Sequence, residues 1–157
     1  MKFKNLVLIA IVCYGLTSCL QDAPEPFDAF EQLAKDQERI TNYLSENGIT
    51  AQKDSLYGVR FVMHTEGTGD KPKVTDRINV DYEGRFMTNG KVFDSNDSIE
   101  FPLNQLVSGW QIVLPYVKEG GSVTMYIPSG YGYGHLGGGS IPADANLIFD
   151  VTLNYIK

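Results

Sequence analysis

Residues 80–95 read Val-Asp-Tyr-Glu-Gly-Arg-Phe-Met-Thr-Asn-Gly-Lys-Val-Phe-Asp-Ser, and this stretch does most to decide the fold. An Asn-Gly pair suits the tight turn of a β-hairpin because both residues tolerate positive φ. Asn89-Gly90 therefore predicts a hairpin that joins residues 85–87 to residues 91–93. A period of two in the apolar residues predicts further strands over residues 57–65, 77–84, 122–128 and 147–156. The second half of the chain is thus predicted to be rich in β-strands.

The segment before these strands is predicted to be an amphipathic helix over residues 28–47. Its apolar positions recur at helical spacing and are Phe30, Leu33, Ala34, Ile40, Tyr43 and Leu44. Asp28 is placed to cap the start, Glu31 stands in the capping-box position, and Asn47-Gly48 is a stop signal. Two roles are open for this helix: packing against its own domain, or serving as a dimerisation segment.

The segments between the strands contain one more helix candidate and two glycine-rich loops. The helix is predicted near residues 110–117, and Pro115 should keep it short or kink it. Residues 67–70, Gly-Thr-Gly-Asp, are predicted to form a loop. Residues 132–137 fit the G-x-G-x-x-G dinucleotide fingerprint, but residues 141–145 lead into a strand rather than a helix. We therefore interpret these glycines as a flexible flap.

The N-terminus has the pattern of an export signal. Two lysines precede an apolar run over residues 6–16, which is too short to span a bilayer comfortably. The run ends in Leu16-Thr17-Ser18-Cys19, which resembles the lipobox of bacterial lipoproteins. The resemblance implies a signal peptide over residues 1–18, acylation of Cys19 and a polar, Pro-rich tether over residues 19–27. The expected location is the cell envelope, on the periplasmic or surface side of a bacterial membrane. The alternative is an ordinary secretory signal with an incidental cysteine.

Composition and charge exclude several classes of function. The chain has 157 residues, 43% of them apolar, which suits one packed domain with an appendage. A formal net charge of −6 and the lack of a Lys/Arg cluster after residue 5 argue against nucleic acid as a partner. The two histidines, His64 and His135, are too far apart for a metal motif, and no serine stands in a G-x-S-x-G setting. We expect no metal and no cofactor.

A series of landmarks continues the quoted stretch in a fixed order. They are Val80-Asp81-Tyr82-Glu83-Gly84, Asn89-Gly90-Lys91-Val92-Phe93-Asp94-Ser95, Phe101-Pro102-Leu103, Leu106-Val107-Ser108-Gly109-Trp110, Glu119-Gly120-Gly121-Ser122, Ile127-Pro128, Tyr131-Gly132-Tyr133-Gly134, Ile141-Pro142-Ala143 and Leu147-Ile148-Phe149-Asp150-Val151. Over residues 58–157 this series resembles the FKBP-type peptidyl-prolyl cis-trans isomerases, and the lipobox makes the chain similar to a bacterial lipoprotein member. The resemblance implies an α+β fold, a half-wrapped antiparallel sheet around a short helix, with the N-terminal amphipathic helix in front. The implied domains are residues 28–56, helix and linker, and residues 57–157, the isomerase domain.

The resemblance also implies a site and its partners. The expected catalytic residues are Tyr82, Phe93, Asp94, Trp110, Tyr133 and Phe149. The expected substrate-binding residues are Ile99, Phe101, Leu106, Val107 and Ile141. Trp110 would begin the helix and form the pocket floor, and the Val107 N–H would be available to a substrate carbonyl. The implied partners are Pro-containing polypeptides, among them exported proteins, and a membrane through the lipid anchor, with the chain a monomer or weak dimer.

The sequence departs from the family pattern in three places. Ile99 stands where the family often has an aromatic wall residue, the segment between Phe101 and Trp110 is shorter than in archetypal members, and the flap over residues 136–140 is very rich in glycine. Substrate preference and macrolide affinity therefore do not follow from the resemblance. A second function is open: a module that binds Pro-containing peptides or acts as a chaperone, with incidental turnover. A third is a structural lipoprotein with an inactive fold.

Overall fold

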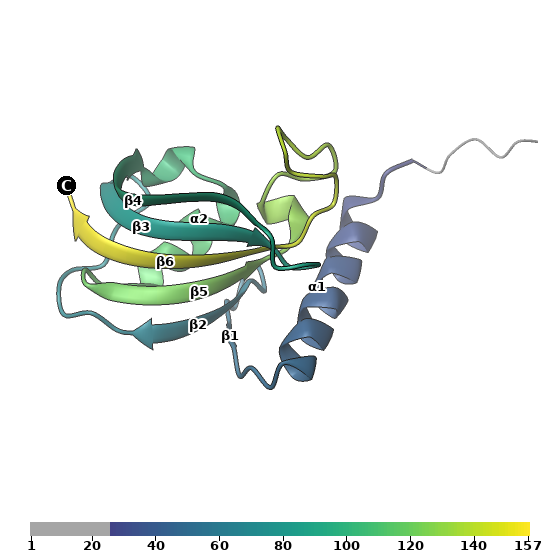
Figure 1. Cartoon of the computed structure of the whole chain (residues 1–157), viewed down its shortest axis with the longest axis horizontal. Coiled ribbons are helices and arrows are strands. Elements are labelled where there is room, and N and C mark those ends of the chain that lie inside the picture. Colours follow the sequence, from purple (N-terminus) through teal and green to yellow (C-terminus); the bar gives the residue numbers. More distant parts are fainter. Residues whose placement is uncertain (1–25) are drawn as a thin grey trace, which may run out of the picture.

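A six-stranded antiparallel sheet dominates the computed structural model, which describes residues 26–157 (Figure 1). Its strands are β1 Gln52–Lys53, β2 Arg60–Thr65, β3 Arg77–Phe86, β4 Val92–Pro102, β5 Gly121–Ile127 and β6 Leu147–Ile156. They lie in the order β1-β2-β5-β6-β3-β4, and every neighbouring pair is antiparallel. The predicted signal peptide, Cys19 and most of the predicted tether fall outside the described residues.

Within residues 26–157, two α-helices and three short 3-10 helices accompany the sheet. They are α1 Ala29–Glu46, η1 Leu103–Gln105, α2 Ser108–Val113, η2 Leu114–Tyr116 and η3 Ser129–Tyr131. The short helix α2 lies against one face of the sheet, whereas α1 crosses the end of the sheet where β5 finishes and β6 begins (Figure 1). The predicted α+β fold, with a sheet around a short helix and an N-terminal helix, is confirmed. Among residues 26–157, no helix combines the length and the apolar character needed to cross a membrane.

The hairpin around Asn89-Gly90 is confirmed, but the strand that follows it is longer than expected. The Phe86 N–H donates to the Lys91 carbonyl at 3.0 Å, and Gly90 takes a φ of +68°. After the turn, β4 continues to Pro102, although only residues 91–93 had been predicted as strand. Most of β4 is polar and exposed, as suits the edge of a sheet, so its sequence lacks the apolar alternation that marks the other strands.

The main core lies between the sheet and α2. Residues along β5 and β6 alternate, so that Met125 and Phe149 point into this core while Tyr126 and Ile148 point the other way, toward α1. Gly109 lets α2 approach β5 closely, because a Cβ there would lie 2.6 Å from Ile127 Cδ1. This approach positions the next residue of α2 over the sheet.

Helix α2 starts earlier than the sequence suggested. It begins at Ser108 and ends at Val113, whereas residues 110–117 had been predicted. Trp110 therefore sits within the first turn rather than at its beginning. The helix is short, as expected, and Pro115 lies in the 3-10 turn that follows it.

Helix α1 has the predicted ends but a different buried face. The Asp28 carboxylate accepts hydrogen bonds from the N–H groups of Phe30 and Glu31, at 2.8 and 3.2 Å. The prediction that Phe30 and Ala34 belong to the buried face is wrong: Phe30 is 87% exposed, and Asp36 is fully buried instead. Relative to the predicted face, the helix is rotated about its axis. Its first half contacts the polar loop that contains Ser129, while its second half contacts apolar side chains. It packs on its own domain, which is the first of the two roles left open above.

A buried carboxylate in the linker after α1 should make stability depend on pH. Asp54 accepts hydrogen bonds from Tyr57 N–H at 2.6 Å, Tyr116 hydroxyl at 2.7 Å and Leu56 N–H at 3.0 Å. Burial alone would raise the pKa of Asp54, but these hydrogen bonds outweigh it and hold the pKa below its ordinary value.

We expect Asp54→Asn to lower the free energy of unfolding by about 1–2 kcal/mol at pH 7. A depressed folded-state pKa contributes stability above the unfolded pKa of about 3.9, and that contribution is lost as the pH falls through the folded value. The difference between wild type and variant should therefore narrow in acid. Urea unfolding at pH 7, 5 and 3.5 measures it, and a difference that stays constant would contradict the prediction.

Candidate functional site

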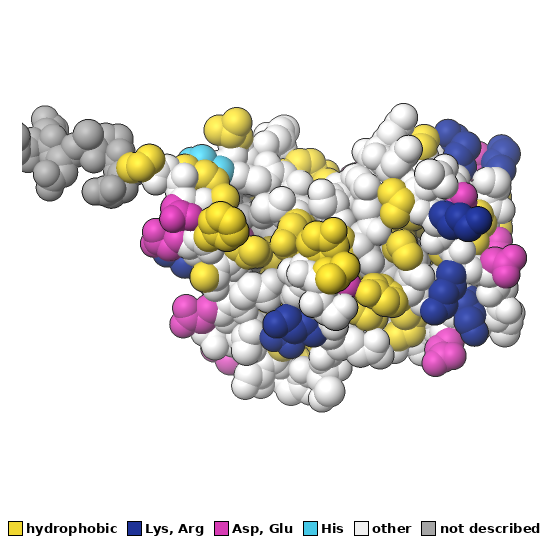
Figure 2. Space-filling model, turned by 180° about the vertical axis from the view of Figure 1, so that it is seen from behind, with side chains coloured by type: hydrophobic (Ala, Val, Ile, Leu, Met, Phe, Trp, Pro, Cys, Tyr) yellow, Lys and Arg dark blue, Asp and Glu magenta, His cyan; other side chains and the backbone are white. Residues whose placement is uncertain are grey.

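A cavity of about 190 Å³ opens between the sheet and α2. Its lining residues are Tyr82 from β3, Asp94 and Phe101 from β4, Leu106 and Val107 from the segment before α2, Trp110 from α2, Tyr133 from the loop after η3, and Phe149 from β6. All eight were predicted from the sequence as site residues. From the α2 side, hydrophobic side chains form a broken band across the surface, while most Lys and Arg side chains gather away from the N-terminal trace (Figure 2).

Three predicted residues lie beside the cavity rather than in its lining. Phe93 and Ile99 are partly buried and pack against the main core, and Ile141 is 7% exposed within it. Phe93 contacts a lining residue, because its ring meets that of Phe149 edge-to-face at a centroid distance of 5.6 Å. The structure thus brings eight of the eleven predicted pocket residues together around one space, while the other three belong to the main core or pack against it.

The aromatic rings of the lining hold one another at right angles. Trp110 meets Tyr82 and Phe149 at centroid distances of 5.4 Å, with interplanar angles of 81° and 83°. Such edge-to-face pairs each add stability beyond the area they bury, and they restrict ring rotation. Trp110 is only 3% exposed, and its Nε1 has no hydrogen-bond acceptor among residues 26–157. Three flat aromatic rings of the lining are therefore packed against one another around the cavity.

Two phenols and one carboxylate supply polarity to the lining. The Tyr82 hydroxyl donates to Asp94 Oδ2 at 2.7 Å. Burial first, and then this hydrogen bond and the charge of Asp94, raise the pKa of Tyr82 well above its ordinary value. Burial and Asp94 also raise the pKa of Tyr133, which is 40% exposed. Both hydroxyls therefore keep their protons and can donate hydrogen bonds at neutral pH.

A backbone donor completes the rim. Val107 precedes α2, and its carbonyl accepts from the Trp110 N–H at 3.0 Å. Within the described part of the chain, the Val107 N–H donates to no backbone or side-chain acceptor. Donation by the Val107 N–H to a ligand carbonyl stays a prediction.

Gly84 is a residue of the site that the sequence interpretation missed. A Cβ at Gly84 would lie 2.7 Å from both Phe149 Cε1 and Phe93 Cζ, so only glycine leaves room for these two rings against β3. A glycine inside a strand often marks such a close approach, and that signal was present in the landmark Tyr82-Glu83-Gly84.

A larger hollow of about 350 Å³ lies on the opposite face of the sheet, and most of the residues that line it are polar. A chain of contacts crosses the strands beside it: His64 Nε2 lies 2.8 Å from Thr124 Oγ1, the Thr124 hydroxyl donates to Asp150, and Asp150 pairs with Arg85 Nη1 at 2.6 Å. These side chains satisfy one another between strands, which accounts for His64 as a structural residue.

Comparison with known proteins identifies the family. The sequence model of the FKBP-type peptidyl-prolyl cis-trans isomerases matches residues 69–154, more than half of the chain. The FKBP-type peptidyl-prolyl cis-trans isomerase FkpA of Aeromonas hydrophila is 37% identical over 134 residues, which cover 83% of this chain and 48% of the relative. The chain spans about half the length of the curated relatives it matches.

Solved structures agree with this assignment. The crystal structure of FkpA from Escherichia coli superposes with a TM-score of 0.71 and 31% identity, covering 83% of this chain and 61% of that one. A peptidyl-prolyl cis-trans isomerase from Pseudomonas syringae pv. tomato superposes with a TM-score of 0.70 and 26% identity, covering 85% and 98%. This chain therefore belongs to the FKBP-type peptidyl-prolyl cis-trans isomerase family.

Proposed function

We propose that this chain accelerates cis/trans isomerisation of X-Pro bonds in polypeptides, including exported proteins. The observation that carries the proposal is the cavity of about 190 Å³. Its lining includes five aromatic side chains, one carboxylate and the Val107 N–H, which donates to no acceptor among residues 26–157. Membership of a family named for this reaction supports it. The catalytic and binding roles assigned to the lining residues are part of the proposal.

The chemistry needs no covalent step. Rotation about an amide bond faces a barrier of about 18–20 kcal/mol because the planar form is stabilised by resonance. Unaided X-Pro bonds therefore exchange over tens to hundreds of seconds. The planar amide is the more polar form, so water stabilises it more than the twisted transition state. An apolar pocket removes that water and destabilises the planar form selectively, which lowers the barrier.

In this proposal, some residues of the cavity fit the shape of the proline ring and others donate hydrogen bonds to the substrate. The flat pyrrolidine ring would lie on Trp110, between the rings of Tyr82 and Phe149, whose edge-to-face packing keeps the slot open. The Val107 N–H would donate to a substrate carbonyl, and the Tyr133 hydroxyl would donate to another. Donors fixed in advance cost no reorganisation when the bond twists.

A protease-coupled assay with an Ala-Pro or Leu-Pro peptide tests the function. The purified chain should accelerate the slow phase of cleavage in proportion to its concentration, and an Asp94→Val preparation made in parallel controls for isomerases of the expression host. No acceleration by the wild-type chain would refute the enzymatic function. Saturable binding of a Pro-containing peptide without acceleration would support the binding-module alternative instead.

We also propose that the chain is a lipoprotein of the cell envelope. In this proposal residues 1–18 are a signal peptide, Cys19 is acylated, residues 19–27 form a tether and residues 57–157 form the isomerase domain. Support comes from the small residues before Cys19 and from the polar, Pro-rich segment after it. Several acyl chains suffice to hold a protein on a membrane without a basic patch.

We expect Cys19→Ala to release the protein from membranes. The measurement is fractionation of host cells followed by detection of the protein in the membrane and soluble fractions. The control is Cys13→Ala, since Cys13 is the other cysteine of the chain and lies inside the proposed signal peptide. Membrane retention of the Cys19 variant, or release of both variants alike, would reject acylation of Cys19 as the anchor.

A further inference from the structure

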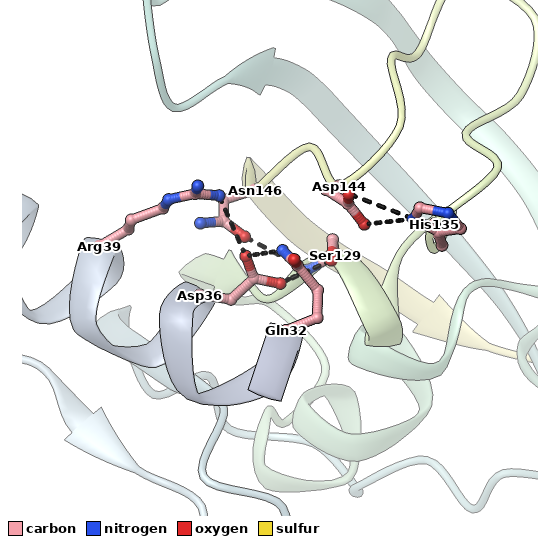
Figure 3. A network of polar contacts seen from close by, with 7 residues as sticks. All are labelled: Gln32, Asp36, Arg39, Ser129, His135, Asp144 and Asn146. Atoms are coloured by element: carbon pink, nitrogen blue, oxygen red, sulfur yellow. Dashed lines mark hydrogen bonds and ion pairs between the residues drawn. The ribbon is translucent and has the colours of Figure 1, made fainter. Parts of the chain in front are cut away.

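A fully buried carboxylate joins α1 to the loop that carries Tyr133. Asp36 has no exposed surface, and its Oδ2 accepts hydrogen bonds from the Ser129 N–H at 2.9 Å and from the Ser129 hydroxyl at 2.5 Å (Figure 3). Its Oδ1 accepts from Gln32 Nε2 at 2.9 Å and lies 3.5 Å from Arg39 Nη1. Three hydrogen bonds and one ion pair therefore hold Asp36 in one geometry, and Asp36 holds Ser129 in turn.

The hydrogen bonds continue from Ser129 to the cavity. The Ser129 carbonyl accepts from the N–H of Gly132 at 2.9 Å and from the N–H of Gly134 at 2.8 Å. These two residues flank Tyr133, whose side chain lines the cavity. On the other side of the loop, the Asp144 N–H donates to the Gly134 carbonyl at 3.1 Å. The position of Ser129 therefore sets the position of Tyr133.

A charged side chain is an unusual choice if the only task is to hold α1 on the domain. Ile40 and Leu44 already pack the second half of α1 against Tyr126 and Ile148. A buried carboxylate carries a large desolvation penalty, and apolar contacts would hold a helix as well or better. Unlike apolar contacts, the hydrogen bonds from Ser129 to the carboxylate are directional, so they fix the position of one residue of the loop.

The N-terminal segment contacts the same loop at a second point. The ring of Phe27 stacks on His135 at a centroid distance of 4.0 Å, and His135 Nδ1 lies 3.2 Å from Asp144 Oδ2 (Figure 3 shows the latter pair). The loop around Tyr133 is thus held from one side by residues before and within α1.

We propose that Asp36 is a positioning residue of the isomerase site, which acts through Ser129 to hold Tyr133 at the cavity. Helix α1 is then part of the working site rather than a spacer between tether and domain. The expected effect on turnover rests on the proposed function. The hold of Asp36 on Ser129, and through it on Tyr133, is a separate property that can be measured without turnover.

The test compares the wild-type chain with Asp36→Ala and with a matched control, Glu119→Ala. Glu119 is also a carboxylate that joins distant segments, since its Oε1 accepts from the Ile156 N–H at 2.6 Å, but it does so at the far end of β6. We expect Asp36→Ala to lower kcat/KM about tenfold. Amide hydrogen exchange, followed by NMR, should quicken at Gly132 and Gly134 far more than in β5 and β6. The control should keep wild-type kcat/KM and wild-type exchange at both glycines.

Two further variants keep the test decisive if Asp36→Ala does not fold. Asp36→Asn preserves volume, and Ser129→Ala removes only the hydroxyl donor; each should lower kcat/KM about threefold, and together no more than either alone. Wild-type turnover and protected glycines in these variants would overturn the inference. Equal acceleration of exchange throughout the domain would also overturn it, as this would indicate general destabilisation.

The test separates failure of the proposed isomerase activity from failure of the proposal that Asp36 holds Ser129 in place. If the wild-type chain does not accelerate isomerisation, the proposed function is wrong. The exchange rates at Gly132 and Gly134 then still test whether Asp36 holds the loop through Ser129, because their measurement requires no turnover.

Discussion

Replacing Gly84 by valine is expected to lower kcat/KM for an Ala-Pro peptide by about two orders of magnitude, while the sheet stays folded. Valine suits a strand, so the backbone of β3 has no reason to rearrange. Its Cβ, however, would lie 2.7 Å from Phe149 and from Phe93, and the additional methyl groups increase the overlap. The two rings must move away, and Phe149 then loses its edge-to-face contact with Trp110. Overpacking of this kind costs about 1–3 kcal/mol in stability.

Two further variants test whether the loss of activity depends on the size of the side chain at position 84. They exclude the alternative that replacing any glycine has the same effect. Gly84→Ala adds a single methyl group and should cost about tenfold in kcat/KM, between wild type and the valine variant. Gly130→Ala is the control, because a Cβ there meets nothing within 4 Å and its φ is not in the left-handed region. The protease-coupled assay and urea unfolding measure both properties. Activity that is unchanged in Gly84→Val, or lost equally in Gly130→Ala, would contradict the prediction.

The sequence predicted the parts of this molecule that depend on local signals. Gly90 takes the positive φ of the predicted turn, and the Asn89 side chain accepts a hydrogen bond from the Lys91 N–H. Alternation of apolar residues predicted β5 and β6. The landmarks around Tyr82, Trp110 and Phe149 predicted residues that the fold brings around one cavity. Strand β4 was predicted only in part, because most of its side chains are exposed and polar and therefore show no apolar alternation.

The features that the sequence did not predict depend on contacts between distant segments. The buried face of α1 is decided by Ser129, which lies 93 residues after Asp36, and nothing in a helical pattern indicates that its partner is a polar loop. The role of Gly84 depends in the same way on a ring from β6. An isolated helix pattern favours the apolar Phe30 over the charged Asp36 as the buried residue, and only the tertiary partner reverses that order.

Loss of the Asp94 carboxylate is expected to be the second large effect, with Asp94→Val lowering kcat/KM by about thirtyfold. The Tyr82 hydroxyl donates to Asp94 at 2.7 Å, and the ring of Tyr82 forms one wall against Trp110. Without the acceptor, the Tyr82 hydroxyl loses the hydrogen bond that fixes its direction, and the ring can turn away from its position. A wall that moves no longer excludes water from the substrate amide, and that exclusion is the proposed source of the rate enhancement.

Comparison of three variants shows whether Asp94 acts through Tyr82. Asp94→Asn keeps an acceptor oxygen of the same shape without the charge, and should lose only about threefold. Tyr82→Phe removes the donor, so the double variant Asp94→Val with Tyr82→Phe should be no slower than Asp94→Val alone. Fluorescence of Trp110, the single tryptophan of the chain, reports on the cavity in each variant and should shift in Asp94→Val but not in Asp94→Asn. Additive losses would mean that Asp94 and Tyr82 act on the substrate independently, and equal losses in the valine and asparagine variants would mean that charge, rather than the hold on Tyr82, is what the site requires.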